Sequence, residues 1–199
     1  MSSNSSDPKA GTLPAKRTIK DYLALSIATV GVGYFPIAPG TMGSLVGVAF
    51  YLALFPLGHH LLFAPVERNR FGELQVGTAE LTIALVTIFL VTMIGVWAAT
   101  RVEKLLHRKD PSIVVIDEVA GQMIALLAAP LWLHTWWSVL TAFLLFRAFD
   151  IWKPYPIRKL ECLESGLGIM ADDLAAGVYA LIANSVLISG YLLWFAPTR

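Results

Sequence analysis

The chain has little charge and almost no cysteine. Lys, Arg, Asp and Glu make up 15% of its 199 residues and hydrophobic residues make up 56%, whereas about a quarter of a soluble domain is charged. The mean hydropathy of +0.66 therefore predicts that the chain lies in a lipid bilayer. A net charge of +1 gives no basic footprint for nucleic acid. The one cysteine, Cys162, excludes an internal disulfide and a cysteine-rich metal site.

Charge is also missing from long stretches, which indicates membrane helices. The apolar segments that we predict to be helical are 22–34, 43–63, 81–100, 113–133, 135–152 and 174–196. The first of these is too short to span comfortably. The sequence thus predicts an all-α, polytopic membrane protein with about four to five apolar helices. Residues 67–80 read as a polar loop. We expect residues 1–20 to be a disordered tail and residues 21–199 a single domain.

Lysine and arginine are unevenly distributed between the two sides of this predicted topology. With the tail inside, eleven of them face the cytoplasm, and Arg68, Arg70 and Arg199 face the other side. This distribution follows the positive-inside rule. It predicts a membrane protein whose polar segments open to the cytoplasm. Trp136, Trp137 and Trp194 then fall at the outer interface, and Trp152 and Tyr155 at the inner one.

Acidic residues recur at the ends of the apolar segments, where a carboxylate is costly unless it is paired, metal-bound or hydrated. They lie in the segments DPSIVVIDEVAG (110–121), FRAFDIWKPYPI (146–157) and GLGIMADDLAAG (166–177). The six residues are Asp110, Asp117, Glu118, Asp150, Asp172 and Asp173. All three segments fall on the predicted cytoplasmic side. We therefore expect one polar site, assembled from several helices.

The predicted hairpin of 113–133 and 135–152 brings two of these segments together. At a rise of 1.5 Å per residue, Asp117 lies roughly 6 Å from the start of its helix. Arg147 and Asp150 lie roughly 8 and 3 Å from the end of the next helix. In an antiparallel pair these residues have the same depth.

Carboxylates without cysteine or histidine partners suit a hard cation such as Mg²⁺. Asp117 and Glu118 are about 100° apart on a helix, so we do not expect both to point squarely at one ion. Glu118 would then bind through water, act as a base, or hold Arg147. The alternative is a set of structural ion pairs and helix caps, in which Asp110 and Asp172 are N-caps.

Two cations and one helix start are candidates for binding phosphate. Arg147 can clamp a phosphate with two hydrogen bonds and Lys153 can supply a point charge. Alternatively, Arg147 pairs with Asp150 and Lys153 extends to the headgroups. The segment APGTMGS (38–44) opens a helix with free backbone N–H groups. Thr41 and Ser44 would bind phosphate there, or serve as ordinary caps.

Four motifs in this order, YFPIAPGTMGS, VIDEVAGQ, FRAFDIWKPYPI and GIMADDLAAG, closely resemble the bacterial phosphatidylglycerophosphatase A family over about residues 20–195. The resemblance implies a Mg²⁺-dependent lipid phosphatase of the bacterial inner membrane that converts phosphatidylglycerophosphate to phosphatidylglycerol in phospholipid biosynthesis. It places all six acids in the site, with Arg147 and Lys153 beside them.

The resemblance leads to a mechanistic hypothesis with assigned residues. Asp117, Asp150, Asp172 and Asp173, with Asp110 nearby, would hold one or two Mg²⁺. Glu118 would help deprotonate a water that attacks in line, or an aspartate would be the nucleophile. A cation transporter and a non-catalytic lipid-binding protein are the alternative functions, and the one-sided placement of the acids argues against the transporter.

Overall fold

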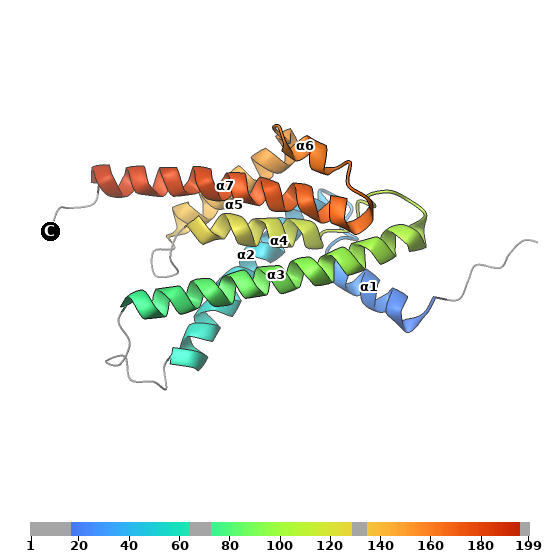
Figure 1. Ribbon diagram of the computed structural model, residues 1–199, viewed down its shortest axis with the longest axis horizontal. Coiled ribbons are helices and arrows are strands. Elements are labelled where there is room, and N and C mark those ends of the chain that lie inside the picture. The colour runs from blue at the N-terminus through green and yellow to red at the C-terminus, as the bar shows by residue number, and fades with distance from the viewer. Residues whose placement is uncertain (1–16, 64–72, 129–134, 196–199) are drawn as a thin grey trace, which may run out of the picture.

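The computed structural model describes residues 17–63, 73–128 and 135–195. Every regular element in these ranges is helical, which confirms the predicted all-α class (Figure 1). The elements are α1 (Ile19–Thr29), α2 (Pro39–Phe63), α3 (Glu73–Leu106), α4 (Ile116–Ala125), the 3₁₀ turn η1 (Leu126–Ala128), α5 (Trp136–Trp152), α6 (Ile157–Leu160) and α7 (Ser165–Phe195).

The short helix α4 is the centre of the bundle. It packs against α2, α3, α5 and α7, and Figure 1 shows it between α3 and α7. Eight of its ten residues are buried. A helix that neighbours cover on nearly every side also buries the polar side chains that it carries, here Asp117 and Gln122. Asp117, one of the buried residues, is therefore carried into the interior by its neighbours.

Within the described ranges, two helices are long and apolar enough to cross a membrane, fewer than the four to five predicted. They are Gln75–Leu106 within α3 and Ser165–Trp194 within α7. The helix predicted for 113–133 begins at Ile116, and its α-helical part ends at Ala125. Residues 129–133 lie outside the described ranges. Since α4 is covered by its neighbours, it needs no spanning length to bury its apolar surface.

Three predicted boundaries are wrong. Residues 73–80 belong to α3 and not to a polar loop, because Glu, Leu, Gln and Ala are good helix formers even where they are polar. Helix α1 begins at Ile19, inside the predicted tail. Helix α7 begins at Ser165, so Asp172 and Asp173 lie about 10 Å along the helix and not at its N-terminus.

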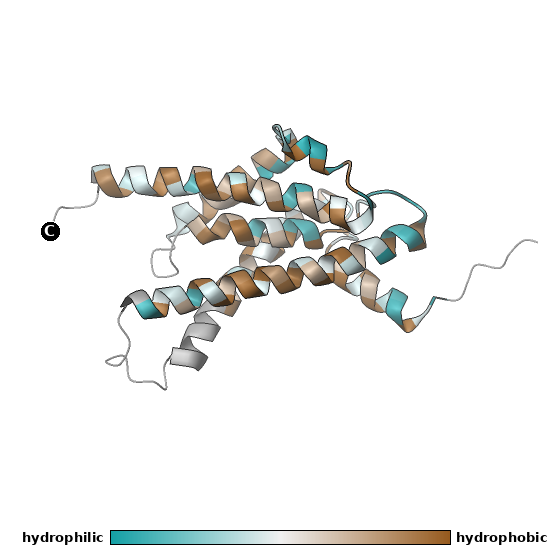
Figure 2. Ribbon diagram, viewed as in Figure 1, coloured by the Kyte–Doolittle hydropathy of each residue, from teal (hydrophilic) through white to brown (hydrophobic). Residues whose placement is uncertain are grey.

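The polar residues gather at one end of the bundle. The N-terminal ends of α1, α4 and α7, the C-terminal end of α3, and α6 all lie at this end in Figure 1. Figure 2 shows hydrophobic residues along the middle of α3 and α7 and hydrophilic residues at this end. The chain is therefore amphipathic along its length, as expected for a protein with one polar face at a membrane surface.

Helix α1 is fastened to α3 by an ion pair beside its first turn. The Asp21 carboxylate accepts hydrogen bonds from the Thr18 backbone N–H at 2.6 Å and from Arg101 Nε at 2.7 Å. The hydrogen bonds from Thr18 and Arg101 lower the pKa of Asp21 below its ordinary value. The resulting stability is present above the unfolded-state pKa and is lost as pH falls through the lower folded-state value.

We expect Asp21→Asn to lower the melting temperature in detergent by a few degrees at neutral pH. The difference in melting temperature from wild type should shrink in strong acid, where the Asp21 carboxyl is protonated in both the folded and the unfolded protein. Thermal unfolding of both proteins across pH measures this. An equal difference at all pH values would show that the charge of Asp21 does not stabilise the fold.

Candidate active site

A cavity of about 290 Å³ opens at the polar end of the bundle. Four segments that are far apart in the sequence contribute to it. Its lining consists of Ala38, Pro39, Gly40, Asp110, Ser112, Val114, Asp117, Glu118, Arg147, Asp150, Lys153, Ile169, Asp172 and Asp173. All six predicted acids and both predicted cations are among these residues. The structure therefore brings together the residues of the three acidic segments.

Three carboxylates converge in this cavity. Asp117 and Glu118 lie in the first turn of α4, and Asp173 lies on α7. One oxygen from each falls within 4.8 Å of the other two. The two adjacent acids therefore each place one oxygen in the same cluster, and the expectation that they do not both point squarely at one ion stays a prediction. The longer Glu118 side chain compensates for the angular offset between neighbouring helical positions.

The cavity also holds buried polar atoms with no hydrogen-bond partner among the described residues. Four of them belong to side chains of the cavity: Asp117 Oδ1, Glu118 Oε2, Arg147 Nε and Asp172 Oδ1. An unsatisfied buried carboxylate oxygen is costly. A hard divalent cation would satisfy the acids, because oxygen donors and a partly open coordination shell are what Mg²⁺ prefers. The residues present thus fit such an ion.

The two cations are paired with acids. Arg147 Nη1 lies 2.6 Å from Asp150 Oδ2 and donates to Ser44 Oγ at 3.4 Å. Lys153 Nζ lies 2.6 Å from both Asp172 Oδ2 and Glu161 Oε1. The alternative pairing of Arg147 with Asp150 is thus present. Both cations stand beside the acidic cluster in the same cavity.

Lys153 owes its position to the end of α5. Its backbone is left-handed, with φ of 47°, which turns the chain out of the helix at this residue. Burial disfavours its charged form, but the hydrogen bonds to Asp172 and Glu161 outweigh burial and raise its pKa above the ordinary value. Lys153 therefore stays cationic across the physiological pH range.

The start of α2 opens on the cavity, but with fewer donors than predicted. Ala38, Pro39 and Gly40 line it, whereas Thr41 and Ser44 do not. The backbone N–H groups of residues 41 and 42 already donate to the Ala38 carbonyl, at 3.0 and 3.3 Å. Proline has no N–H. The backbone N–H groups of residues 41 and 42 are therefore not free as predicted, and the phosphate-binding roles of Thr41 and Ser44 stay predictions.

Asp110 lies at the edge of the site. It is exposed and lines the cavity, and its φ of 48° is left-handed, a conformation that aspartate tolerates better than most residues. It is outside the group of three converging carboxylates. Asp150 and Asp172 are outside it too, since each is paired with a cation. The metal-binding roles of all five predicted ligands stay predictions: Asp110, Asp117, Asp150, Asp172 and Asp173.

Close glycine contacts set the distance between the acidic helices. A Cβ on Gly121 of α4 would lie 2.5 Å from the Asp173 carbonyl oxygen, and a Cβ on Gly177 of α7 would overlap the backbone of Gly121. Asp117 and Asp173 each lie four residues, about one turn, before these glycines. The backbone contact of α4 with α7 therefore holds the two carboxylates together.

Sequence reasoning missed two contributors to the site. Glu161 forms an ion pair with Lys153, although it lies outside the three acidic segments. Gly40 lies against Glu118, because a Cβ there would overlap the Glu118 carboxylate. The spacing of Gly40, Gly43 and Gly47 at one helical turn was the available signal for a close helix contact. No local pattern marks Glu161.

Comparison with known proteins places the chain in a family. Residues 26–188 match the family described as Phosphatidylglycerophosphatase A. A Bacteroides thetaiotaomicron protein, provisionally named phosphatidylinositol-3-phosphatase, is 41% identical over 83% of this chain and 93% of its own length. The Phosphatidylglycerophosphatase A of Escherichia coli is 33% identical over 74% of this chain and 73% of its own. The Haemophilus influenzae protein of that name is 35% identical over 76% of this chain and 80% of its own length. No solved structure matches the chain.

A helical bundle with acids and cations in one cavity, together with these relatives, defines the class of the chain: it is a phosphatase, a hydrolase of phosphoric monoesters. Within that class, the chain belongs to the phosphatidylglycerophosphatase A family. The resemblance read from the four motifs is thereby confirmed.

Proposed function

We propose that the protein hydrolyses phosphatidylglycerophosphate to phosphatidylglycerol and phosphate, with Mg²⁺ as cofactor, in phospholipid biosynthesis. The observation that carries this proposal is the cavity itself. Three converging carboxylates, two of which have an unsatisfied oxygen, lie beside two cations. This combination can hold a cation and a phosphate together. The name of the family indicates which lipid carries that phosphate.

In the proposed reaction, the chain's own residues position the phosphate and move a proton. Asp117, Glu118 and Asp173 would hold the ion. When bound, Mg²⁺ would neutralise phosphoryl charge and make water more acidic. Arg147 and Lys153 bind the phosphoryl oxygens and oppose the charge that develops on them. Glu118 accepts the proton of the attacking water through its second carboxylate oxygen as the water oxygen bonds to phosphorus. The P–O bond to the glycerol headgroup breaks, and the proton passes from Glu118 to the departing glycerol oxygen. An aspartyl-phosphate route is the alternative, and trapping with labelled substrate separates the two.

We also propose that the protein spans the bacterial inner membrane several times, with the site facing the cytoplasm. The gathering of polar residues at one end of the bundle (Figure 2) supports this orientation. Trp152 and Tyr155 at that end are 72% and 74% exposed, and Trp136 and Trp194 at the opposite helix ends are 80% and 83% exposed. Aromatic side chains in two such belts suit the two membrane interfaces. Residues 68, 70 and 199 lie outside the described ranges.

A second substrate class follows from the Bacteroides relative, whose provisional name specifies a phosphoinositide. Inositol and glycerol headgroups both present a phosphomonoester on a diacylglycerol phosphodiester, so the same cavity chemistry serves either. Phosphate release from phosphatidylglycerophosphate and from phosphatidylinositol phosphate, in matched micelles with Mg²⁺, decides between them. A kcat/KM at least about tenfold higher for the glycerol lipid supports the proposal. The reverse preference would move the protein to phosphoinositide chemistry.

The non-enzymatic alternatives have separate tests. A transporter would carry cations into liposomes without releasing phosphate. A lipid-binding protein would retain substrate without metal-dependent turnover. Both are disfavoured by the family of the chain and by carboxylates that gather at one end of the bundle.

Lys153→Met should lower kcat/KM for the lipid phosphate about 10- to 100-fold. A hydrogen bond from a charged donor contributes about 1.5–3 kcal/mol, and losing that free energy from the transition state lowers kcat/KM by this factor. Part of the loss should appear as a higher KM, because Lys153 faces the incoming phosphate. Steady-state kinetics measure it.

Lys159→Met is the matched control, because Lys159 is exposed and lies 5.0 Å from the centre of the Tyr155 ring, away from the acids. It should keep wild-type kinetics. Equal losses in the two variants would remove Lys153 from the site.

A further inference from the structure

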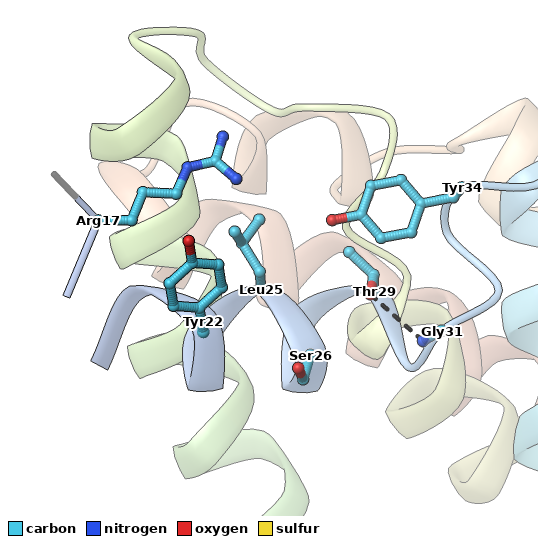
Figure 3. Close-up of a pocket in the computed structure, with 7 residues that line it drawn as sticks. All are labelled: Arg17, Tyr22, Leu25, Ser26, Thr29, Gly31 and Tyr34. Atoms are coloured by element: carbon cyan, nitrogen blue, oxygen red, sulfur yellow. Dashed lines mark hydrogen bonds between the residues drawn. The ribbon is translucent and has the colours of Figure 1, made fainter. Parts of the chain in front are cut away.

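A second cavity, of about 310 Å³, lies beside α1 and is separate in its lining from the acidic one. It is lined by Arg17, Tyr22, Leu25, Ser26, Thr29, Gly31 and Tyr34. Figure 3 shows Arg17, Tyr22 and Tyr34 around one space, with Leu25 between them. Leu25 and Thr29 form a buried floor, and Arg17, Tyr22 and Tyr34 form an exposed rim. No acidic residue is in the lining.

The polar groups on this rim are available to a ligand. No described residue forms a hydrogen bond or ion pair with the side chains of Arg17, Tyr22 or Tyr34. The acid nearest in sequence, Asp21, is already bound to Thr18 and Arg101. A guanidinium and two phenolic hydroxyls are all donors to an anion, and guanidinium geometry matches phosphate oxygens. The cavity therefore suits a phosphate group.

The surroundings of this rim indicate a lipid, not a soluble anion. Ile19 and Leu23, on the same helix, are 80% and 53% exposed, and Phe35 and Ile37 after Tyr34 are 49% and 72% exposed. Exposed apolar side chains around a polar cavity are typical of a surface that rests at the boundary of headgroups and acyl chains. A phosphate bound there would carry its acyl chains into the bilayer beside these residues.

The second cavity is close to the acidic site along the chain. The Val115 N–H donates to the Ala28 carbonyl at 2.8 Å, and Gly33 packs against the Ile113 carbonyl. Segments 28–34 and 110–115 thus lie side by side, and the first continues into Ala38, which lines the acidic cavity. The proposed substrate carries a phosphodiester between its acyl chains and its terminal phosphate. The segment that lines the second cavity is thus packed against a segment that lines the acidic cavity.

We propose that the Arg17–Tyr22–Tyr34 cavity binds the phosphodiester of an anionic phospholipid. If the bound phospholipid is the substrate itself, this inference rests on the proposed function. A neighbouring lipid of the bilayer has the same chemistry. The two sources predict different consequences for an Arg17 variant.

The test compares Arg17→Gln with Lys20→Gln, an exposed cation near the same end of α1 that does not line the cavity. KM is measured in micelles for phosphatidylglycerophosphate, which has a phosphodiester, and for phosphatidic acid, which has none. In parallel, the rise in melting temperature on adding short-chain phosphatidylglycerol, against phosphatidylcholine, reports lipid binding without turnover. Tyr34→Phe gives a second variant that removes one donor and keeps the ring.

If the cavity holds the substrate's own phosphodiester, Arg17→Gln raises KM for phosphatidylglycerophosphate about tenfold and leaves phosphatidic acid unchanged. If it holds a neighbouring lipid, both KM values stay, and the phosphatidylglycerol-dependent rise in melting temperature is lost. The inference is overturned if neither readout changes, if both substrates are affected equally, or if Lys20→Gln has the same effect. The change in melting temperature tests lipid binding even if the wild-type protein releases no phosphate. Failure of this inference is therefore distinguishable from failure of the proposed function.

Discussion

Asp173→Asn should reduce phosphate release from phosphatidylglycerophosphate by on the order of a thousandfold or more, with the fold retained. Asp173 is 4% exposed and supplies the only carboxylate of the converging group that comes from α7. The amide keeps the size of the side chain but removes the charge that would hold a divalent cation. The expected fall is in kcat, because the ion acts on the reacting phosphate and not on the lipid chains.

Asp21→Asn is the matched control for this substitution. Asp21 is also a buried aspartate, 6% exposed, but it pairs with Arg101 and is absent from the cavity. It should keep near-wild-type kcat at a temperature below its unfolding transition. Steady-state kinetics and thermal unfolding of both variants in the same detergent make the comparison. Full activity of a folded Asp173→Asn protein would remove this carboxylate from the reaction.

Gly177→Ala is expected to have the second large effect, at a position with no chemistry of its own. The added methyl group would meet the carbonyl and Cα of Gly121, and backbone atoms cannot turn aside as a side chain can. Overpacking of this kind costs about 1–3 kcal/mol. Because the contact sets the separation of Asp117 from Asp173, a shift near 1 Å should lower kcat by on the order of a hundredfold.

Gly190→Ala on the same helix provides the control. A Cβ at Gly190 meets nothing within 4 Å, and alanine is the better helix former by about 1 kcal/mol. This variant should be as active as wild type and at least as stable. Kinetics and thermal unfolding distinguish the pair. If Gly177→Ala is as active as Gly190→Ala, close contact of α4 with α7 does not position the acids.

The acidic cavity could be predicted because carboxylates inside apolar segments can be recognised from the sequence alone. Carboxylates such as Asp117 and Asp150 inside apolar segments are costly unless they meet a partner, and the equal depth of helix ends in a hairpin follows from the helical rise alone. The all-α class followed from charge-free segments of helical length in the same way. Each of these inferences uses only local composition and a known repeat.

The details that were not predictable depend on contacts between helices. Nothing local shows that Glu161 reaches Lys153, or that Gly121 meets Gly177. Likewise, hydropathy shows where an apolar segment begins and not where the helix begins. The first turns of α3 and α7, which precede the apolar segments, were therefore missed. The convergence of Glu118 with Asp117 required side-chain torsions that helical angles alone do not specify.

Phosphate release from phosphatidylglycerophosphate in detergent micelles, with Mg²⁺, with EDTA and with Asp117→Asn protein, tests the central proposal most directly. We predict rapid release by wild type with Mg²⁺, background release with EDTA that is restored by excess Mg²⁺, and background release by Asp117→Asn under every condition. Release by folded wild-type protein that is unaffected by EDTA, or that survives loss of Asp117, would contradict a metal-assisted site built on these carboxylates.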